Sequence, residues 1–248
     1  MIVARSADEA RQTRRRYVNE NGGASWATDY FGLFPPDGVT PETGTLYPVA
    51  FMVEFDPHFV SQPHFHVANQ FQVFVSGSGS IGKEPLRGVT VHYASAYSPY
   101  GPLTSDAGGL TYLTLRNGWD PGIHYLPKYR DELHAARRKP RAAVSERLEP
   151  TLPTDLMQLR GVGEDVVLPC EPDGLGAWRY RIPAQHVAHG PDPAAGGGQY
   201  WLVLEGGGDL GGRPLGTLTC LFLSPDEERH DVRAGAAGLD VLALQFPP

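Results

Sequence analysis

The second half of the sequence repeats the first half at a constant offset of 129 residues. From Gln70 to Leu115, 13 of 46 positions are identical to the residue 129 positions later, without a gap. Average residue usage predicts about three such identities by chance. The chain is therefore predicted to be a duplicated domain, with residues 1–150 as the first copy and 151–248 as the second.

Both copies have the pattern of β-strands joined by turns. Residues 71–75 and 200–204 are short apolar runs, and residues 111–115 and 240–246 alternate with a period of two. Glycine and proline, 30 and 23 of the 248 residues, are abundant, and the glycine-rich stretch 77–82 is predicted to be a hairpin turn. These features predict an all-β fold and exclude helix bundles.

Two segments are predicted to be helical. Ser6 with Glu9 three residues later matches a capping box, so a short N-terminal helix is expected to run to about Asn19. Residues 127–148 are predicted to form a helical linker between the two copies, broken or kinked at Pro140.

Charge and composition exclude several classes of partner. The formal net charge is −7, and the densest basic clusters, residues 14–16 and 137–139, are interpreted as solvated helix faces, so no nucleic-acid partner is expected. No apolar run is long enough to span a bilayer, and the charged N-terminus lacks the apolar core of a signal peptide. The two cysteines, Cys170 and Cys220, do not form a disulfide framework. We expect a cytoplasmic monomer or homodimer whose partner is a small molecule.

Paired histidines in the first copy are the strongest candidates for chemistry. If residues 64–74 form one strand, then His64, His66, Gln70, Gln72 and Phe74 point to the same face. Two imidazoles two residues apart present their nitrogens to a common point, as a divalent metal requires. An adjacent side-chain oxygen would add a third ligand.

The spacing of these residues resembles the first motif of the cupin superfamily. His64-x-His66, three residues, Gln70, six residues and Gly77 match that motif, with Gln70 where a metal-binding glutamate usually stands. Together with the duplication, the chain resembles a bicupin, which implies two jelly-roll (double-stranded β-helix) barrels. The resemblance implies a divalent metal ion, Fe(II) first with Mn, Ni or Zn as alternatives, and oxygenase, isomerase or lyase chemistry. Glutamine in place of glutamate removes one negative charge, which should weaken metal affinity.

The third nitrogen of a cupin metal site has two candidate replacements here. The second cupin motif usually supplies a histidine, and its position is occupied by Tyr100 in the turn 98–102. His92 is the nearest histidine and is the predicted third nitrogen, so the predicted metal ligands are His64, His66, Gln70 and His92. The phenol of Tyr100 is either a ligand or a proton donor and is the predicted catalytic group.

The second copy lacks the paired histidines. The repeat places Pro193 and Ala195 at their positions, and only Gln199 is retained. The C-terminal copy is therefore predicted to be a degenerate, structural cupin domain.

Three functions are compatible with this sequence. The first is a metal-dependent cupin enzyme, oxygenase-like, that acts on a small apolar or aromatic molecule. The second is a metal-free isomerase or cyclase that uses Tyr100, His64 and His66 as acid–base groups. The third is a non-catalytic bicupin that binds a small molecule.

Overall fold

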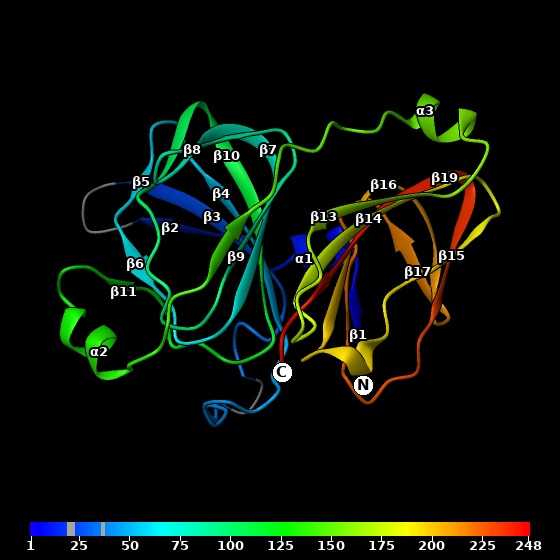
Figure 1. Cartoon of the computed structure of the whole chain (residues 1–248). Coiled ribbons are helices and arrows are strands. Elements are labelled where there is room, and N and C mark those ends of the chain that lie inside the picture. The colour runs from blue at the N-terminus through cyan, green and yellow to red at the C-terminus, as the bar shows by residue number, and fades with distance from the viewer. Residues whose placement is uncertain (19–22, 36–37) are drawn as a thin grey trace. The chain divides into compact units, whose positions relative to one another are not determined.

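The chain folds into two compact units in a computed structural model that describes residues 1–18, 23–35 and 38–248 (Figure 1). The N-terminal unit comprises Gln12–Glu149, and the C-terminal unit comprises Met1–Arg11 together with Pro150–Pro248. The sequence repeat predicts that the second copy begins at residue 151, and the C-terminal unit resumes at Pro150. The assignment of the first eleven residues to the N-terminal domain is corrected, because β1 (Ile2–Arg5) pairs with β18 (Cys220–Leu223) of the C-terminal unit.

The described part of the N-terminal unit contains a nine-stranded antiparallel sheet. Its path runs β12-β9-β7-β10-β4-β3-β2, with β5 beside β10 and β8 beside β7. The pairing does not close into a ring. The short strands β6 (His64–Phe65) and β11 (His124–Tyr125) pair separately. The sheet strands are β2 (Arg15–Val18), β3 (Ala24–Phe31), β4 (Val49–Phe55), β5 (Val60–Ser61), β7 (Gln70–Ile81), β8 (Glu84–Arg87), β9 (Thr90–Ala94), β10 (Leu103–Arg116) and β12 (Ala142–Val144).

The C-terminal unit repeats this arrangement in an eight-stranded sheet, also unclosed. Its path runs β1-β18-β16-β19-β14-β13, with β15 beside β19 and β17 beside β16. The further strands are β13 (Gly163–Leu168), β14 (Gly176–Ile182), β15 (Val187–His189), β16 (Gln199–Leu210), β17 (Arg213–Gly216) and β19 (Asp231–Gln245). Adding 129 to the bounds of β7 and β8 gives those of β16 and β17, so the sequence repeat is a structural repeat.

Repeated glycines mark the bend in the longest strand pair of each unit. Gly77 in β7 and Gly109 in β10 have φ of 80° and 74°, and a Cβ on Gly77 would lie 2.2 Å from the Gly109 carbonyl oxygen. Gly206 and Gly238 have φ of 80° and 82° and the same close approach. Only glycine fits this irregular pairing without strain. The prediction of a hairpin turn at 77–82 is wrong, because β7 continues through the glycines to Ile81.

The helices are shorter than predicted. Ser6 and Glu9 form the expected capping bonds, but α1 (Ala7–Arg11) ends early, and the predicted end at Asn19 lies outside the described residues. In the predicted linker helix, only α2 (Arg130–Ala135) is helical, and β12 follows it; α3 (Pro153–Gln158) and a short 3-10 turn, Pro193–Ala195, lie in the C-terminal unit. None of the helices in the described ranges has the length and apolar character needed to cross a bilayer.

The basic cluster 14–16 lies in and beside β2, not on a helix face. Arg14 pairs with Glu54, and Arg16 pairs with Asp56, both on or beside β4. The Arg14 guanidinium also lies 3.9 Å from the centre of the Trp26 ring on β3. These contacts between distant segments favour the extended conformation over the local helical preference.

Candidate functional site

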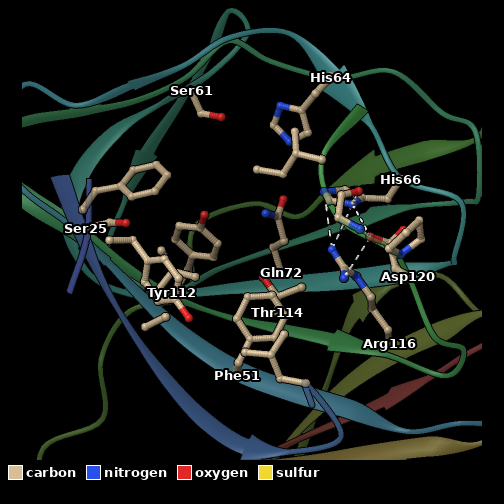
Figure 2. A pocket seen from close by; sticks show the side chains of 18 of the residues that line it. Ser25, Phe51, Ser61, His64, His66, Gln72, Tyr112, Thr114, Arg116 and Asp120 are labelled. Atoms are coloured by element: carbon tan, nitrogen blue, oxygen red, sulfur yellow. Dashed lines mark hydrogen bonds and ion pairs between the residues drawn. The ribbon is translucent and has the colours of Figure 1, made fainter. Parts of the chain in front are cut away.

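A cavity of about 650 Å³ lies inside the N-terminal unit (Figure 2). One part of its wall is apolar and aromatic, and the other part holds polar side chains. A volume of this size suits a small organic ligand. The apolar lining includes Leu33, Phe34, Phe51, Val53, Phe55, Phe59, Tyr112, Trp119, Ile123 and Tyr125. The polar lining includes Ser25, Ser61, His64, His66, Gln72, Tyr100, Thr114, Arg116 and Asp120.

His64 presents a lone pair to this cavity. Its backbone is fixed by reciprocal hydrogen bonds with the backbone of Tyr100, at 3.1 and 3.0 Å. The Nδ1 atom lies 2.6 Å from the carbonyl oxygen of Gln62, so Nδ1 bears the proton and Nε2 bears the lone pair. Burial, followed by the neighbouring His66, lowers the pKa of His64 to about 3, so the ring is neutral near pH 7.

His66 is held by a buried carboxylate. Its Nδ1 lies 2.9 Å from Oδ1 of Asp120 and 3.1 Å from the carbonyl oxygen of Gly122, and both are acceptors. Nδ1 therefore donates, and Nε2 bears the lone pair. Burial would raise the pKa of Asp120, but Arg116, His66 and the Val67 N–H outweigh it and hold that pKa well below its usual range.

Arg116 begins a directional chain of hydrogen bonds. Its guanidinium pairs with Asp120, with Nη1 3.2 Å from Oδ1, and donates through Nε and Nη2 to Oε1 of Gln70, both at 3.2 Å. This fixes the Gln70 amide, whose Nε2 donates to the Tyr100 hydroxyl oxygen at 2.6 Å. Tyr100 thus accepts from Gln70, and its own hydrogen has no acceptor among the residues that the structure describes. Burial raises the pKa of Tyr100 further above its usual range, so the phenol keeps that hydrogen.

His92 lies beside this chain. It is opposite Gln72 in the pairing of β9 with β7, and its Nδ1 lies 2.9 Å from Oε1 of Gln72. Because that oxygen is an acceptor, Nδ1 bears the proton. Burial lowers the pKa of His92 to about 3.

The structure brings the predicted site residues together. The ring centre of Tyr100 lies 4.5 Å from that of His64, 4.9 Å from that of His92 and 6.3 Å from that of His66. Gln70 reaches Tyr100 directly. Residues 64–74 are not one strand, since β6 ends at Phe65 and β7 begins at Gln70, yet His64, His66, Gln70 and Gln72 are all buried.

Sequence reasoning missed Arg116 and Asp120. Arg116 lies directly opposite Gln70 in the pairing of β10 with β7. Tyr112, Thr114 and Arg116 alternate along β10, and all three line the cavity. Extending the predicted strand 111–115 by one residue would have placed Arg116 on this face. Asp120 follows the strand in a loop, and no periodic pattern identifies it.

The predicted metal ligands do not fit a divalent cation in this arrangement. Oε1 of Gln70 accepts two hydrogen bonds from Arg116, and Nη2 of Arg116 lies 3.0 Å from Nδ1 and 3.4 Å from Nε2 of His66. The guanidinium therefore occupies the lone pairs of the Gln70 oxygen and lies beside the His66 ring, where it places a positive charge next to the atoms that a metal would need. Among the described residues, no group of three or more His, Cys, Asp or Glu side chains is arranged to hold a metal ion.

The corresponding region of the C-terminal unit is filled by core residues. The repeat places Trp201 at the position of Gln72, and Trp201 is 1% exposed and stacks on Tyr180 with ring centres 5.8 Å apart. Gln199 and Gln245 correspond to Gln70 and Arg116 and bond to each other at 2.7 Å. Pro193 and Ala195 lie in the 3-10 turn.

Comparison with known proteins identifies the fold. No protein-family model matches the sequence, and no curated protein sequence matches it. Among solved structures, the bacterial pirin YhhW from Escherichia coli, in complex with nickel(II), is 17% identical with a TM-score of 0.58, and the match covers 100% of each chain.

Two further structures share this fold. Vicilin from Corylus avellana is 10% identical with a TM-score of 0.55 over 99% of this chain and 85% of that one. Quercetin 2,3-dioxygenase from Acinetobacter baumannii is 14% identical with a TM-score of 0.50, over 96% of this chain and 80% of that one. The chain therefore has the two-domain cupin fold, as its sequence motif and repeat predicted. Identities this low establish the fold alone.

Proposed function

We propose that the N-terminal unit binds a small aromatic or apolar molecule and transforms it by acid–base chemistry at Tyr100 and His64. The observation that supports this most is the direction of the hydrogen bond between Gln70 and Tyr100. Because Gln70 donates, the Tyr100 hydrogen is available to an oxygen atom of a ligand in the cavity. The aromatic wall opposite would hold the apolar part of that ligand.

The two groups have complementary roles in this proposal. Tyr100 donates a hydrogen bond to a carbonyl oxygen and makes the adjacent C–H bond more acidic. His64, through Nε2, accepts the proton released from that carbon, and returning it at another position completes an isomerisation. The reaction consumes no oxidant and needs no cofactor. Arg116 and Asp120 keep Gln70 and His66 in place and do not touch the reacting atoms.

A matched pair of probes tests the binding step. Benzophenone and diphenylmethane carry the same two phenyl rings, and their central carbon bears a carbonyl oxygen in the first and two hydrogens in the second. Ligand-observed NMR or calorimetry on the full chain measures both affinities. We expect wild-type protein to prefer benzophenone by about threefold to tenfold, the value of one hydrogen bond. Tyr100→Phe should abolish this preference.

The matched control is Tyr125→Phe, which removes a phenol from the same cavity outside the hydrogen-bonded chain. It should leave the preference unchanged. The proposal fails if the wild-type protein binds neither compound, or if Tyr100→Phe retains the preference for the ketone.

A metal-dependent, oxygenase-like enzyme is the second candidate. It is favoured by the fold shared with a nickel-bound pirin and a quercetin dioxygenase. This function requires one tightly bound metal ion per chain, and His64→Ala should abolish that binding. Metal analysis after incubation with Fe(II), Mn(II), Ni(II) or Zn(II) would detect that ion.

We further propose that the C-terminal unit has a structural role. The replacement of both paired histidines and the apolar filling around Trp201 support this role.

A further inference from the structure

Arg116 lies among the groups that the cupin motif would offer to a metal. It contacts His66 and Gln70, two of the four predicted ligands, and only 4% of its surface is exposed. Figure 2 shows the guanidinium beside both His66 and Asp120 at the polar end of the cavity. The guanidinium occupies the space beside these ligands. Although it is paired with Asp120, its positive charge opposes a second cation at this point, because little water is present to screen the two charges.

The three predicted histidine ligands keep the hydrogen bonds that are usual for metal-binding histidines. Metal-ligating histidines usually donate their second N–H to a carboxylate or a carbonyl oxygen, as His66 does to Asp120 and Gly122. His64 has the same arrangement with the carbonyl of Gln62, and His92 has it with the amide oxygen of Gln72. All three imidazoles are therefore held with a lone pair on Nε2.

We propose that Arg116 replaces the divalent cation of the cupin fold, and that its charge, rather than the loss of a glutamate at position 70, keeps divalent metals out of the cavity. Arg116 then does structurally what a metal would do: it orients His66 and, through Gln70, turns the Tyr100 hydroxyl toward the ligand. This inference deepens the proposed function, since a fixed organic cation suits chemistry that needs no metal.

Nickel(II) binding to the ligand-free full chain tests the inference. We expect the wild-type protein to bind Ni(II) weakly and Arg116→Gln to bind it at least about tenfold more tightly, because one positive charge is removed. Arg116→Lys keeps the charge and should resemble the wild type. In Arg116→Gln, the added change His92→Ala or His64→Ala should abolish the gain.

Gln70→Glu separates the two explanations for weak metal binding. It restores the residue usual in the motif while Arg116 stays, so we expect no gain in Ni(II) affinity. It is also nearly isosteric, which keeps the test valid should Arg116→Gln fail to fold. The control for loss of a buried cation is Arg179→Gln, since Arg179 forms a buried ion pair with Asp240 in the C-terminal unit.

The outcomes distinguish this inference from the proposed function. Stoichiometric, tight Ni(II) binding by the wild type would overturn it, as would a gain in Gln70→Glu or Arg116→Lys equal to that expected for Arg116→Gln. A folded Arg116→Gln that gains nothing would also overturn it. The probe-binding experiment on Tyr100 is independent of every one of these results.

Discussion

His64 and His92 are buried and neutral, and this has a measurable effect on stability. Burial lowers the pKa of each to about 3, whereas an imidazole in the unfolded chain has a pKa of about 6.5. Between these values the unfolded state binds more protons than the folded state, so stability is lost as the pH falls below about 6.5. Each imidazole should contribute about 2 kcal/mol to the loss between pH 7 and pH 5.

The change His92→Leu tests this, since leucine is the residue at the equivalent position 221. Urea unfolding at pH 7 and pH 5 should show that His92→Leu loses about 2 kcal/mol less than the wild type on acidification. The control is His186→Leu, which makes the same substitution at an exposed histidine of the C-terminal unit. Equal losses in His92→Leu and the wild type would show that His92 is not protected from protonation.

The contrast between the predicted and the missed site residues has a physical cause. His64, His66 and Gln70 are close in sequence, so their spacing is visible in one segment. Arg116 meets Gln70 only through the register of β10 against β7, and Asp120 arrives from the loop beyond. A local pattern records which residues share a segment, but it does not record which distant charges fold against them.

At the level of elements, the long strands could be predicted from the sequence, whereas the elements near the N-terminus could not. The predicted strand segments 71–75, 111–115 and 200–204 lie within β7, β10 and β16, and the segment 240–246 overlaps β19, which ends at Gln245. The N-terminal helix was predicted too long because the capping box is a local signal, whereas β1 and β2 are extended by pairing with β18 and β3. Long-range pairing overrides local preference at such positions.

Strand β1 should stabilise the edge of the C-terminal sheet. It pairs with β18 over four residues, and the Met1 ammonium donates to Ser224 and Glu227. Deleting residues 1–5 leaves β18 at the edge, so we expect at least about tenfold faster amide hydrogen exchange in Cys220–Leu223. Strand β7 of the N-terminal unit is the internal control. Unchanged exchange in β18 would show that the pairing with β1 adds no protection.

At the level of the molecule, the two copies share one architecture but differ in their interiors. The N-terminal unit encloses a cavity, whereas the corresponding region of the C-terminal unit is filled by side chains. The glycines and the long strands are common to both copies, so the fold was evident from the repeat. The difference between the interiors arises from single substitutions at equivalent positions, such as Gln72 and Trp201 or Arg116 and Gln245. The fold thus tolerates either a cavity or a filled core, and the side chains on the inner strands decide which one forms.

We therefore expect Gln72→Trp to close the cavity. The indole would fill the cavity of the N-terminal unit as Trp201 fills the equivalent region of the C-terminal unit. Benzophenone affinity should therefore fall at least about tenfold. The lost bond to His92 and tighter packing should cost about 1–3 kcal/mol, which circular dichroism melting would measure. The reverse change, Trp201→Gln, should destabilise the chain by about 3–5 kcal/mol and leave benzophenone binding intact. Wild-type affinity in a folded Gln72→Trp variant would mean that the ligand binds outside this cavity.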